Sequence, residues 1–125
     1  MRSVDTNIVV RYLVNDDPHQ FAIARNIFRS GEVFVATTVL LETEWVLRSA
    51  YRYKTDALLD ALAAVAGIPG VTIEDPAALA EAIALCREGM DFADALHLAA
   101  SAGCDTFLTF DRRLVQGAGG RAALA

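Results

Sequence analysis

A short strand that runs directly into a helix is encoded by Val33-Phe34-Val35-Ala36-Thr37-Thr38-Val39-Leu40-Leu41-Glu42. The first four residues form an apolar run after the helix stop at Gly31, which is typical of a compact buried strand. A capping residue, Thr37 or Thr38, then opens a helix whose apolar contacts include Trp45 and which ends near Tyr53. Strand-to-helix units of this kind build parallel sheets that are covered by helices.

The same alternation continues on both sides of this unit. Asp17-Pro18 and Asp75-Pro76 each combine a helix cap with a proline in the first turn, and each predicts a helix start. The predicted strands are residues 3–5, 33–36, 71–73 and 106–110. The predicted helices are residues 6–14, 17–29, 37–53, 56–66, 75–88, 92–102 and a short one from 111.

We therefore expect an α/β fold in which residues 1–125 form a single domain. Because helices of ten or more residues connect successive strands, the strands should be parallel. They should form a central sheet of four to five strands, flanked by helices on both faces. Only Arg121 to Ala125 could supply the fifth strand, and alanine is a poor strand former. The sequence therefore leaves undecided whether a fifth strand forms the last edge of the sheet.

The composition excludes several classes of protein. With 54% apolar and 22% charged residues, the chain is neither a disordered tail nor a disulfide scaffold. A chain of 125 residues can bury one contiguous core. The 16 acidic and 11 basic residues give a net charge of −5, which argues against a simple basic surface for nucleic acid.

Cysteine usage and apolar runs predict a cytoplasmic protein. Cys86 and Cys104 share no CxxC spacing, and we expect both to be small buried hydrophobic residues. The longest uncharged run, residues 61–73, is shorter than the roughly 20 apolar residues of a membrane-spanning helix. No apolar leader segment follows Met1.

Four acidic residues lie where open α/β sheets bind ligands, beyond the carboxyl ends of strands. Asp5 ends the first predicted strand and Asp111 follows the fourth, whereas Glu42 and Asp94 lie in the first turns of two helices. These four side chains could meet at one edge of the sheet. Clustered carboxylates without matching bases are costly unless cations join them, and oxygen ligands suit Mg²⁺ or Mn²⁺ rather than zinc.

Each of these acids also has a purely structural interpretation. Asp5 and Asp111 could be ordinary helix N-caps, and Asp91 is open between a cap and a metal ligand. Glu42 and Asp94 lie in mostly apolar helices, where a carboxylate needs a partner, so the functional interpretation is favoured for these two. Spacing alone leaves the alternatives open.

Four motifs occur in the order expected of PIN-domain ribonucleases. They are Val4-Asp5-Thr6-Asn7, Thr37-Thr38-Val39-Leu40-Leu41-Glu42, Asp91-Phe92-Ala93-Asp94-Ala95-Leu96-His97 and Thr109-Phe110-Asp111. Over essentially its whole length, the chain resembles the VapC toxin branch of bacterial type II toxin–antitoxin pairs.

The resemblance implies roles for individual residues. The residues that match the family's metal-binding acids are Asp5, Glu42, Asp94 and Asp111. Asp91 matches a frequent additional acid, and Asn7 and Thr109 match polar residues that orient the site. His97, one turn after Asp94, is interpreted as a packed or supporting residue rather than a ligand or base.

The resemblance also implies an activity and partners. One or two Mg²⁺ ions at these acids would bridge the scissile RNA phosphate and lower the pKa of a bound water that attacks phosphorus. The products should carry 5′-phosphate and 3′-hydroxyl ends. A homodimer and a cognate antitoxin that packs on an apolar groove are further implied.

Two groups of basic residues are candidate RNA contacts. One group is Arg48, Arg52 and Lys54, and the other is Arg112-Arg113, directly after Asp111. Both groups could equally be solvated surface charge.

Rival functions account for fewer of these features. A phospho-receiver domain needs an Asp at the end of a mid-chain strand and a late lysine, but Lys54 is the only lysine. An inactive RNA- or partner-binding module, and a housekeeping RNA-processing nuclease, stay open as alternatives. Assigning five of the 16 acids to one site leaves 11 acids against 11 bases, so the −5 is the charge of the metal-free site.

Overall fold

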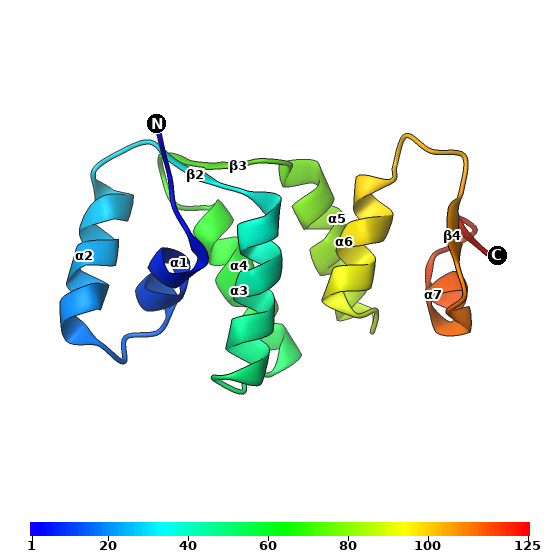
Figure 1. The fold of residues 1–125 in the computed structure, drawn as a ribbon, viewed down its shortest axis with the longest axis horizontal. Coiled ribbons are helices and arrows are strands. Elements are labelled where there is room, and N and C mark those ends of the chain that lie inside the picture. The colour runs from blue at the N-terminus through cyan, green and yellow to red at the C-terminus, as the bar shows by residue number, and fades with distance from the viewer. The chain divides into compact units, whose positions relative to one another are not determined.

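The structure of the protein is a computed structural model that describes all 125 residues, from Met1 to Ala125. Figure 1 labels its helices and strands. The chain divides into two compact units, residues 1–76 and residues 77–125. Each unit contains its own parallel sheet.

The first unit alternates strands and helices around a three-stranded sheet. Its elements are β1 (Arg2–Ser3), α1 (Thr6–Leu13), α2 (Pro18–Arg29), β2 (Val33–Val35), α3 (Thr37–Ser49), α4 (Thr55–Ala66) and β3 (Val71–Ile73). The strand order is β1-β2-β3, and both pairings are parallel, with Ser3 beside Phe34 and Phe34 beside Thr72. Helix α1 packs against α2 and α3, and α3 packs against α4 (Figure 1).

In the first unit, the buried residues recur with the spacing expected for a strand or a helix. Val33 and Val35, two residues apart on β2, point to the same side of the sheet and are completely buried. Leu40 and Leu47, two turns apart on α3, are buried on the helix face directed into the core. Their burial fixes the rotation of α3 and therefore the side on which its remaining residues lie.

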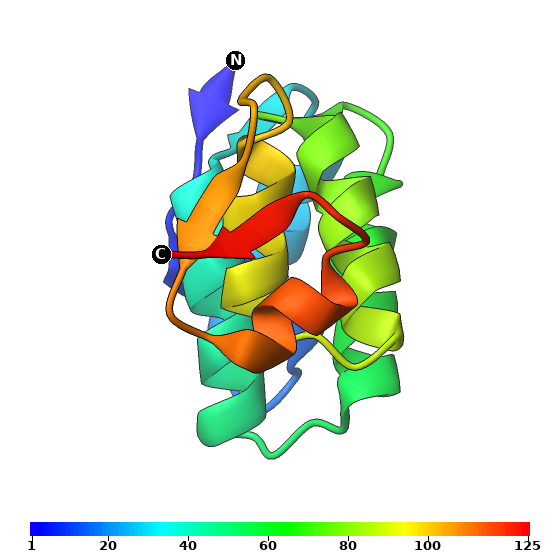
Figure 2. The ribbon, with the colours of Figure 1, turned by 90° about the vertical axis from the view of Figure 1, so that its right-hand side faces the viewer.

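The second unit holds the two-stranded sheet. Its elements are α5 (Pro76–Arg87), which begins at the unit boundary, α6 (Phe92–Ala100), β4 (Phe107–Thr109), α7 (Arg112–Gly117) and β5 (Ala122–Leu124). Figure 2 shows β4 and β5 side by side, with α7 between them in the chain. They pair in parallel, with Phe107 opposite Ala122 and Thr109 opposite Leu124. Ala122 packs into a core with Leu98 and Leu114.

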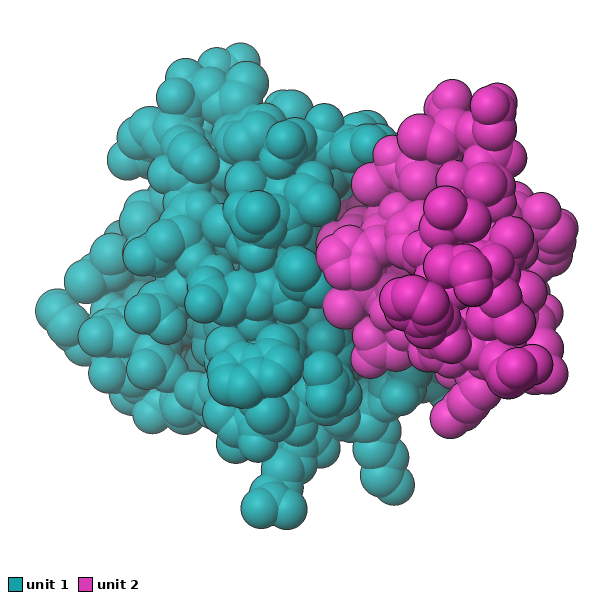
Figure 3. All heavy atoms as spheres, turned by 45° about the vertical axis from the view of Figure 1, so that its right-hand side comes forward, with its two compact units in different colours: residues 1–76 teal, residues 77–125 magenta.

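The predicted α/β fold with parallel strands is confirmed. Five strands form, three in the first unit and two in the second, as two sheets rather than one continuous sheet. Figure 3 colours the two units separately. The segment from Arg121 to Ala125, for which the sequence left strand formation undecided, does contain a strand, β5 (Ala122–Leu124). Arg121 holds it in place, because its guanidinium pairs with Glu81 on α5 and donates a hydrogen bond to the carbonyl of Leu98 at 2.9 Å.

Several local predictions are wrong. Cys104 is exposed, whereas Cys86 is buried as expected. Trp45 is 58% exposed, because the buried positions of α3 lie on the opposite side of the helix at about 100° per residue. The cap of α3 is also not a threonine side chain. Instead, the carboxylate of Glu74, beyond β3, accepts the backbone N–H of Thr37 at 2.9 Å. None of the helices is both long and apolar enough to span a membrane.

Candidate functional site

In the first unit, the carboxylates of Asp5 and Glu42 belong to two packed helices. Asp5 follows β1 as the N-cap of α1, and its Oδ1 accepts the backbone N–H of Ile8 at 3.2 Å. Glu42 lies near the start of α3, and its Oε1 accepts a hydrogen bond from the hydroxyl of Thr6. Since Thr6 directly follows Asp5, this bond brings the start of α1 to the catalytic candidate on α3.

Thr6 contacts a candidate site residue, and the sequence patterns did not single it out. Its side chain is buried, 7% exposed, and its hydroxyl is committed to Glu42. The available signal was a hydroxyl residue in the first turn of a helix, immediately after an acidic cap. Asn7, which the resemblance assigns to orienting the site, is exposed and makes no side-chain hydrogen bond.

In the second unit, the carboxylates of Asp91 and Asp111 act electrostatically on that of Asp94. Asp94 lies in the first turn of α6 and is partly buried. This burial raises the pKa of Asp94, and the negative charges of Asp91 and Asp111 raise it further, whereas His97 acts in the opposite direction. His97 is itself exposed, so it is not packed, and its action on Asp94 fits the other expected role, that of a supporting residue. The structure therefore brings Asp91, Asp94 and Asp111 into one electrostatic group.

The backbone holds these carboxylates in defined positions. Asp91 is the N-cap of α6, and its Oδ2 accepts the N–H of Asp94 at 3.2 Å. Asp111 is the N-cap of α7, and its Oδ1 accepts the N–H groups of Arg113 at 2.9 Å and Leu114 at 3.3 Å. The hydroxyl of Thr109 accepts the backbone N–H of Asp111 at 3.0 Å.

Capping is thus a real role of Asp5, Asp91 and Asp111. It does not compete with metal binding, because each cap uses one carboxylate oxygen and leaves the second oxygen available. A cap also restricts the side chain to one orientation, which lowers the entropic cost of placing that oxygen on a ligand. The question of Asp91 as cap or ligand is therefore not a choice between exclusive alternatives.

The donor chemistry of both groups suits a hard divalent cation. All five candidate ligands are carboxylates, and in the second unit Asp91 and Asp111 disfavour the charged form of Asp94, an effect that a bound cation would relieve. No three acidic, histidine or cysteine side chains lie close enough together to form a complete metal site. In the first unit Glu42 is linked to the residue after Asp5 through Thr6, and in the second unit Asp91 and Asp111 act on Asp94.

The sequence was compared with models of known protein families and with curated proteins. The model of the PIN domain matches residues 3–120, a range that includes all five carboxylates. The chain belongs to the PIN domain family. PIN domains are generally nucleases that act on RNA and depend on divalent metal ions. No curated protein matches this chain significantly.

The candidate RNA contacts of this PIN domain differ in their surroundings within the protein. Arg48 is engaged by the buried Glu44, with its Nε 2.9 Å from Oε2 and a second nitrogen 3.2 Å from Oε1. This two-point contact stabilises α3 and directs the Arg48 guanidinium toward Glu44. Arg112 and Arg113 are exposed in the first turn of α7.

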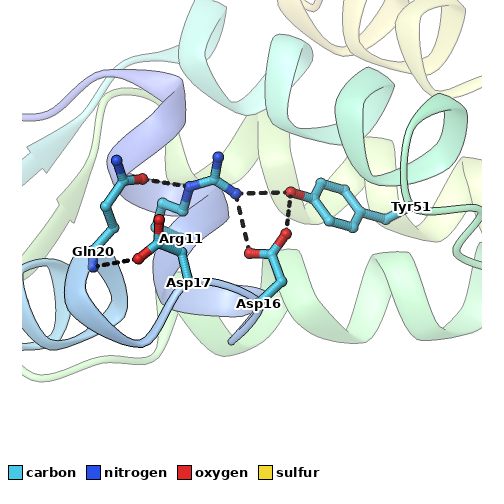
Figure 4. Close-up of polar contacts among 5 residues, drawn as sticks. All are labelled: Arg11, Asp16, Asp17, Gln20 and Tyr51. Atoms are coloured by element: carbon cyan, nitrogen blue, oxygen red, sulfur yellow. Dashed lines mark hydrogen bonds and ion pairs between the residues drawn. The ribbon is translucent and has the colours of Figure 1, made fainter.

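A polar network fixes the helix that Asp5 caps (Figure 4). Arg11, near the end of α1, donates to the side chains of Gln20 at 2.6 Å, Asp16 at 3.1 Å and Tyr51 at 2.8 Å. The Tyr51 hydroxyl in turn donates to Asp16 at 3.0 Å. The bond with Tyr51 raises the pKa of the Arg11 guanidinium. This network connects α1 to the start of α2 and to the segment after α3.

The first unit of the PIN domain also contains a cavity of about 530 Å³, formed by α1, α2 and the segment before β3. The residues that line it are Tyr12, Leu13, Phe21, Arg25, Phe28, Arg29, Ile68 and Pro69. The Arg25 guanidinium lies over the ring of Phe21, 5.7 Å from its centroid. The lining is therefore mainly apolar, with two cationic groups one helical turn apart.

Proposed function

We propose that this PIN domain is a metal-dependent endoribonuclease that hydrolyses RNA phosphodiester bonds in the cytoplasm. The observation that carries the proposal is the placement of three acids at the starts of two helices of the second unit: backbone N–H groups orient Asp91 and Asp111, and burial together with these two neighbours raises the pKa of Asp94. The family match supports the same chemistry, and because it crosses the boundary between the two units, it supports residues 1–125 acting as one domain.

The residues that would hold Mg²⁺ or Mn²⁺ are Asp5, Glu42, Asp94 and Asp111, with Asp91 as a further ligand. When bound, such ions lower the pKa of a water nucleophile and stabilise charge on the phosphate oxygens. The chain itself contributes orientation. Asp5, Asp91 and Asp111 are fixed as helix caps, and Thr6 and Thr109 hold Glu42 and the Asp111 backbone through hydrogen bonds.

Cleavage of single-stranded RNA by the purified protein tests the proposal. We expect cleavage with Mg²⁺ or Mn²⁺, none in excess EDTA, and products with 5′-phosphate and 3′-hydroxyl ends. Asp94→Asn should abolish cleavage and keep the folded circular-dichroism spectrum, whereas Asp105→Asn, an exposed acid elsewhere in the second unit, should cleave normally. Equal cleavage in EDTA would show that the metal mechanism is wrong.

We further propose that the biological role is that of a toxin in a VapBC-type pair, acting as a homodimer and inhibited by a cognate antitoxin. The cavity in the first unit supports an antitoxin partner, because its mainly apolar lining offers an anchor site and its Arg25 and Arg29 would attract acidic side chains. Expression of the wild-type chain should arrest growth, and co-expression of the small protein encoded next to it should relieve the arrest.

Growth arrest and metal-dependent cleavage distinguish the toxin role from two alternative functions. A housekeeping RNA-processing nuclease would cleave RNA in vitro without arresting growth. An inactive RNA- or partner-binding module would bind RNA without any metal-dependent cleavage. Light scattering of the purified protein tests the homodimer independently of either outcome.

A further inference from the structure

Trp45 is exposed on the same side of α3 as Glu42. Its side chain is 58% exposed, which is unusual for the largest aromatic residue in a chain of this size. Residues three apart on a helix are surface neighbours, with Cβ atoms about 5–6 Å apart, so Trp45 lies one turn beyond Glu42. The core-facing side chains Leu40 and Leu47 hold this face of α3 outward.

The surroundings of Trp45 on α3 are mostly polar. Of the four residues three or four positions away, Glu42, Arg48 and Ser49 are exposed and polar, and only Leu41 is apolar. The core of a protein–protein interface is instead a contiguous apolar patch. A single large ring surrounded by polar groups fits a flat, polar-edged partner such as a nucleobase.

We propose that Trp45 is a stacking platform for an RNA base adjacent to the phosphate that is cleaved. This inference rests on the proposed function and deepens it, because it assigns a residue that positions single-stranded RNA beside Glu42. Stacking on aromatic side chains accepts any base, so Trp45 contributes affinity and position rather than sequence choice. The chain continues from α3 to the exposed Arg52 and Lys54, whose charges favour the RNA backbone.

The chain offers a direct test, because Trp45 is its only tryptophan. Single-stranded RNA is titrated into the wild-type protein in EDTA, where binding proceeds without cleavage, and intrinsic fluorescence is recorded. We expect saturable quenching by RNA, and no quenching by a polyphosphate chain that carries charge but no bases. In parallel, the anisotropy of a labelled RNA gives the dissociation constant of each variant.

Trp45→Ala should weaken RNA binding about tenfold, since a stacked base contributes about 1–3 kcal/mol and 1.4 kcal/mol corresponds to a factor of ten. Trp45→Phe, which keeps an aromatic face, should recover most of this affinity. The matched control is Ile23→Ala, which truncates another exposed apolar side chain of the first unit and should bind RNA like the wild type. With Mg²⁺, Trp45→Ala should raise KM with little change in kcat.

The outcomes separate this inference from the nuclease proposal. If the wild type cleaves RNA but Trp45 is not quenched and Trp45→Ala binds normally, the stacking role is wrong and the nuclease stands. If RNA quenches Trp45 but no metal-dependent cleavage occurs, the binding platform stands and the nuclease is wrong. If Trp45→Ala converts a dimer into a monomer with unchanged RNA affinity per chain, Trp45 belongs to a subunit interface and the inference is overturned.

Discussion

The hydroxyl of Thr6 donates a hydrogen bond to Oε1 of Glu42, and so joins two residues that are 36 positions apart in the chain. Thr6 lies in the first turn of α1, directly after the cap Asp5, and Glu42 lies on α3. The bond fixes the Glu42 carboxylate with respect to the helix that Asp5 caps. It therefore links the two candidate acids of the first unit, Asp5 and Glu42, through the side chain of Thr6.

Thr6→Val tests this contact, because valine has nearly the shape of threonine and lacks the donor. We expect RNA cleavage to fall about 10- to 100-fold, since small misplacements of catalytic groups have effects of this order. Unfolding free energy should fall by only about 1 kcal/mol, the usual contribution of one hydrogen bond. Thr6→Ser, which keeps the hydroxyl, should retain most of the activity. Wild-type rates for Thr6→Val would remove Thr6 from the site.

Asp94→Asn should stabilise the metal-free protein. The pKa of Asp94 is raised above its usual 3.8 by burial and by its acidic neighbours, so the folded state binds its proton more tightly than the unfolded state. Stability from this group is therefore lost as the pH rises from the unfolded pKa through the folded pKa, and the loss is complete above the latter. Thermal unfolding in EDTA at neutral pH should show a higher Tm for Asp94→Asn than for wild type.

The pH profile gives the control for this prediction. Below the unfolded pKa of Asp94, where the carboxyl is protonated in both states, the Tm advantage of Asp94→Asn should shrink. Asp105→Asn also removes one negative charge from the second unit and should show no comparable gain. A lower Tm for Asp94→Asn at neutral pH would contradict the electrostatic account of the cluster.

Asp111 combines a structural and a proposed catalytic role that substitutions can separate. Asp111→Asn keeps a capping oxygen for Arg113 and Leu114 but loses the charge, so cleavage should be lost while the Tm stays within a few degrees. Asp111→Ala removes both, and should additionally lower the unfolding free energy by about 1 kcal/mol. Thermal unfolding and RNA cleavage of the two variants check this. Full cleavage by Asp111→Asn would leave Asp111 as a cap alone.

Tyr51→Phe should destabilise the first unit, because it removes the hydroxyl that Arg11 and Asp16 share. We expect the unfolding free energy to fall by about 1–2 kcal/mol, from two hydrogen bonds that involve charged groups but lie near solvent. Tyr53→Phe is the matched control, since the side chain of Tyr53 makes no hydrogen bond, and it should change stability by less than about 0.5 kcal/mol. Urea unfolding of both variants provides the measurement, and equal values would show that the network contributes nothing.

Predictions from local sequence signals succeeded where the physical cause is itself local. Asp17 caps α2 ahead of Pro18, as the Asp-Pro pair predicted, because both cap and proline act within one helical turn. Asp5 and Asp111 follow strands as expected, and both cap the next helix. The alternation of apolar strands and amphipathic helices likewise predicted the parallel α/β fold, since each element must bury its own apolar face.

Local sequence signals could not predict the features that depend on contacts between distant segments. The rotation of α3 is set by the burial of Leu40 and Leu47 in the first unit, and this rotation decides that Trp45 faces outward. Likewise, the alanine-rich end forms β5 despite the low strand propensity of alanine. Arg121 holds it in place through an ion pair with Glu81 and a hydrogen bond to the carbonyl of Leu98.

The sequence by itself therefore determined the order of the elements and the family, and it supplied the five candidate acids. Only the tertiary structure decided what surrounds them: Thr6 donates a hydrogen bond to Glu42, and Asp91 and Asp111 raise the pKa of Asp94. The reason is physical. Caps and periodicity are decided within a few residues of chain, whereas burial, hydrogen bonds and charge interactions depend on distances in space that packing alone creates.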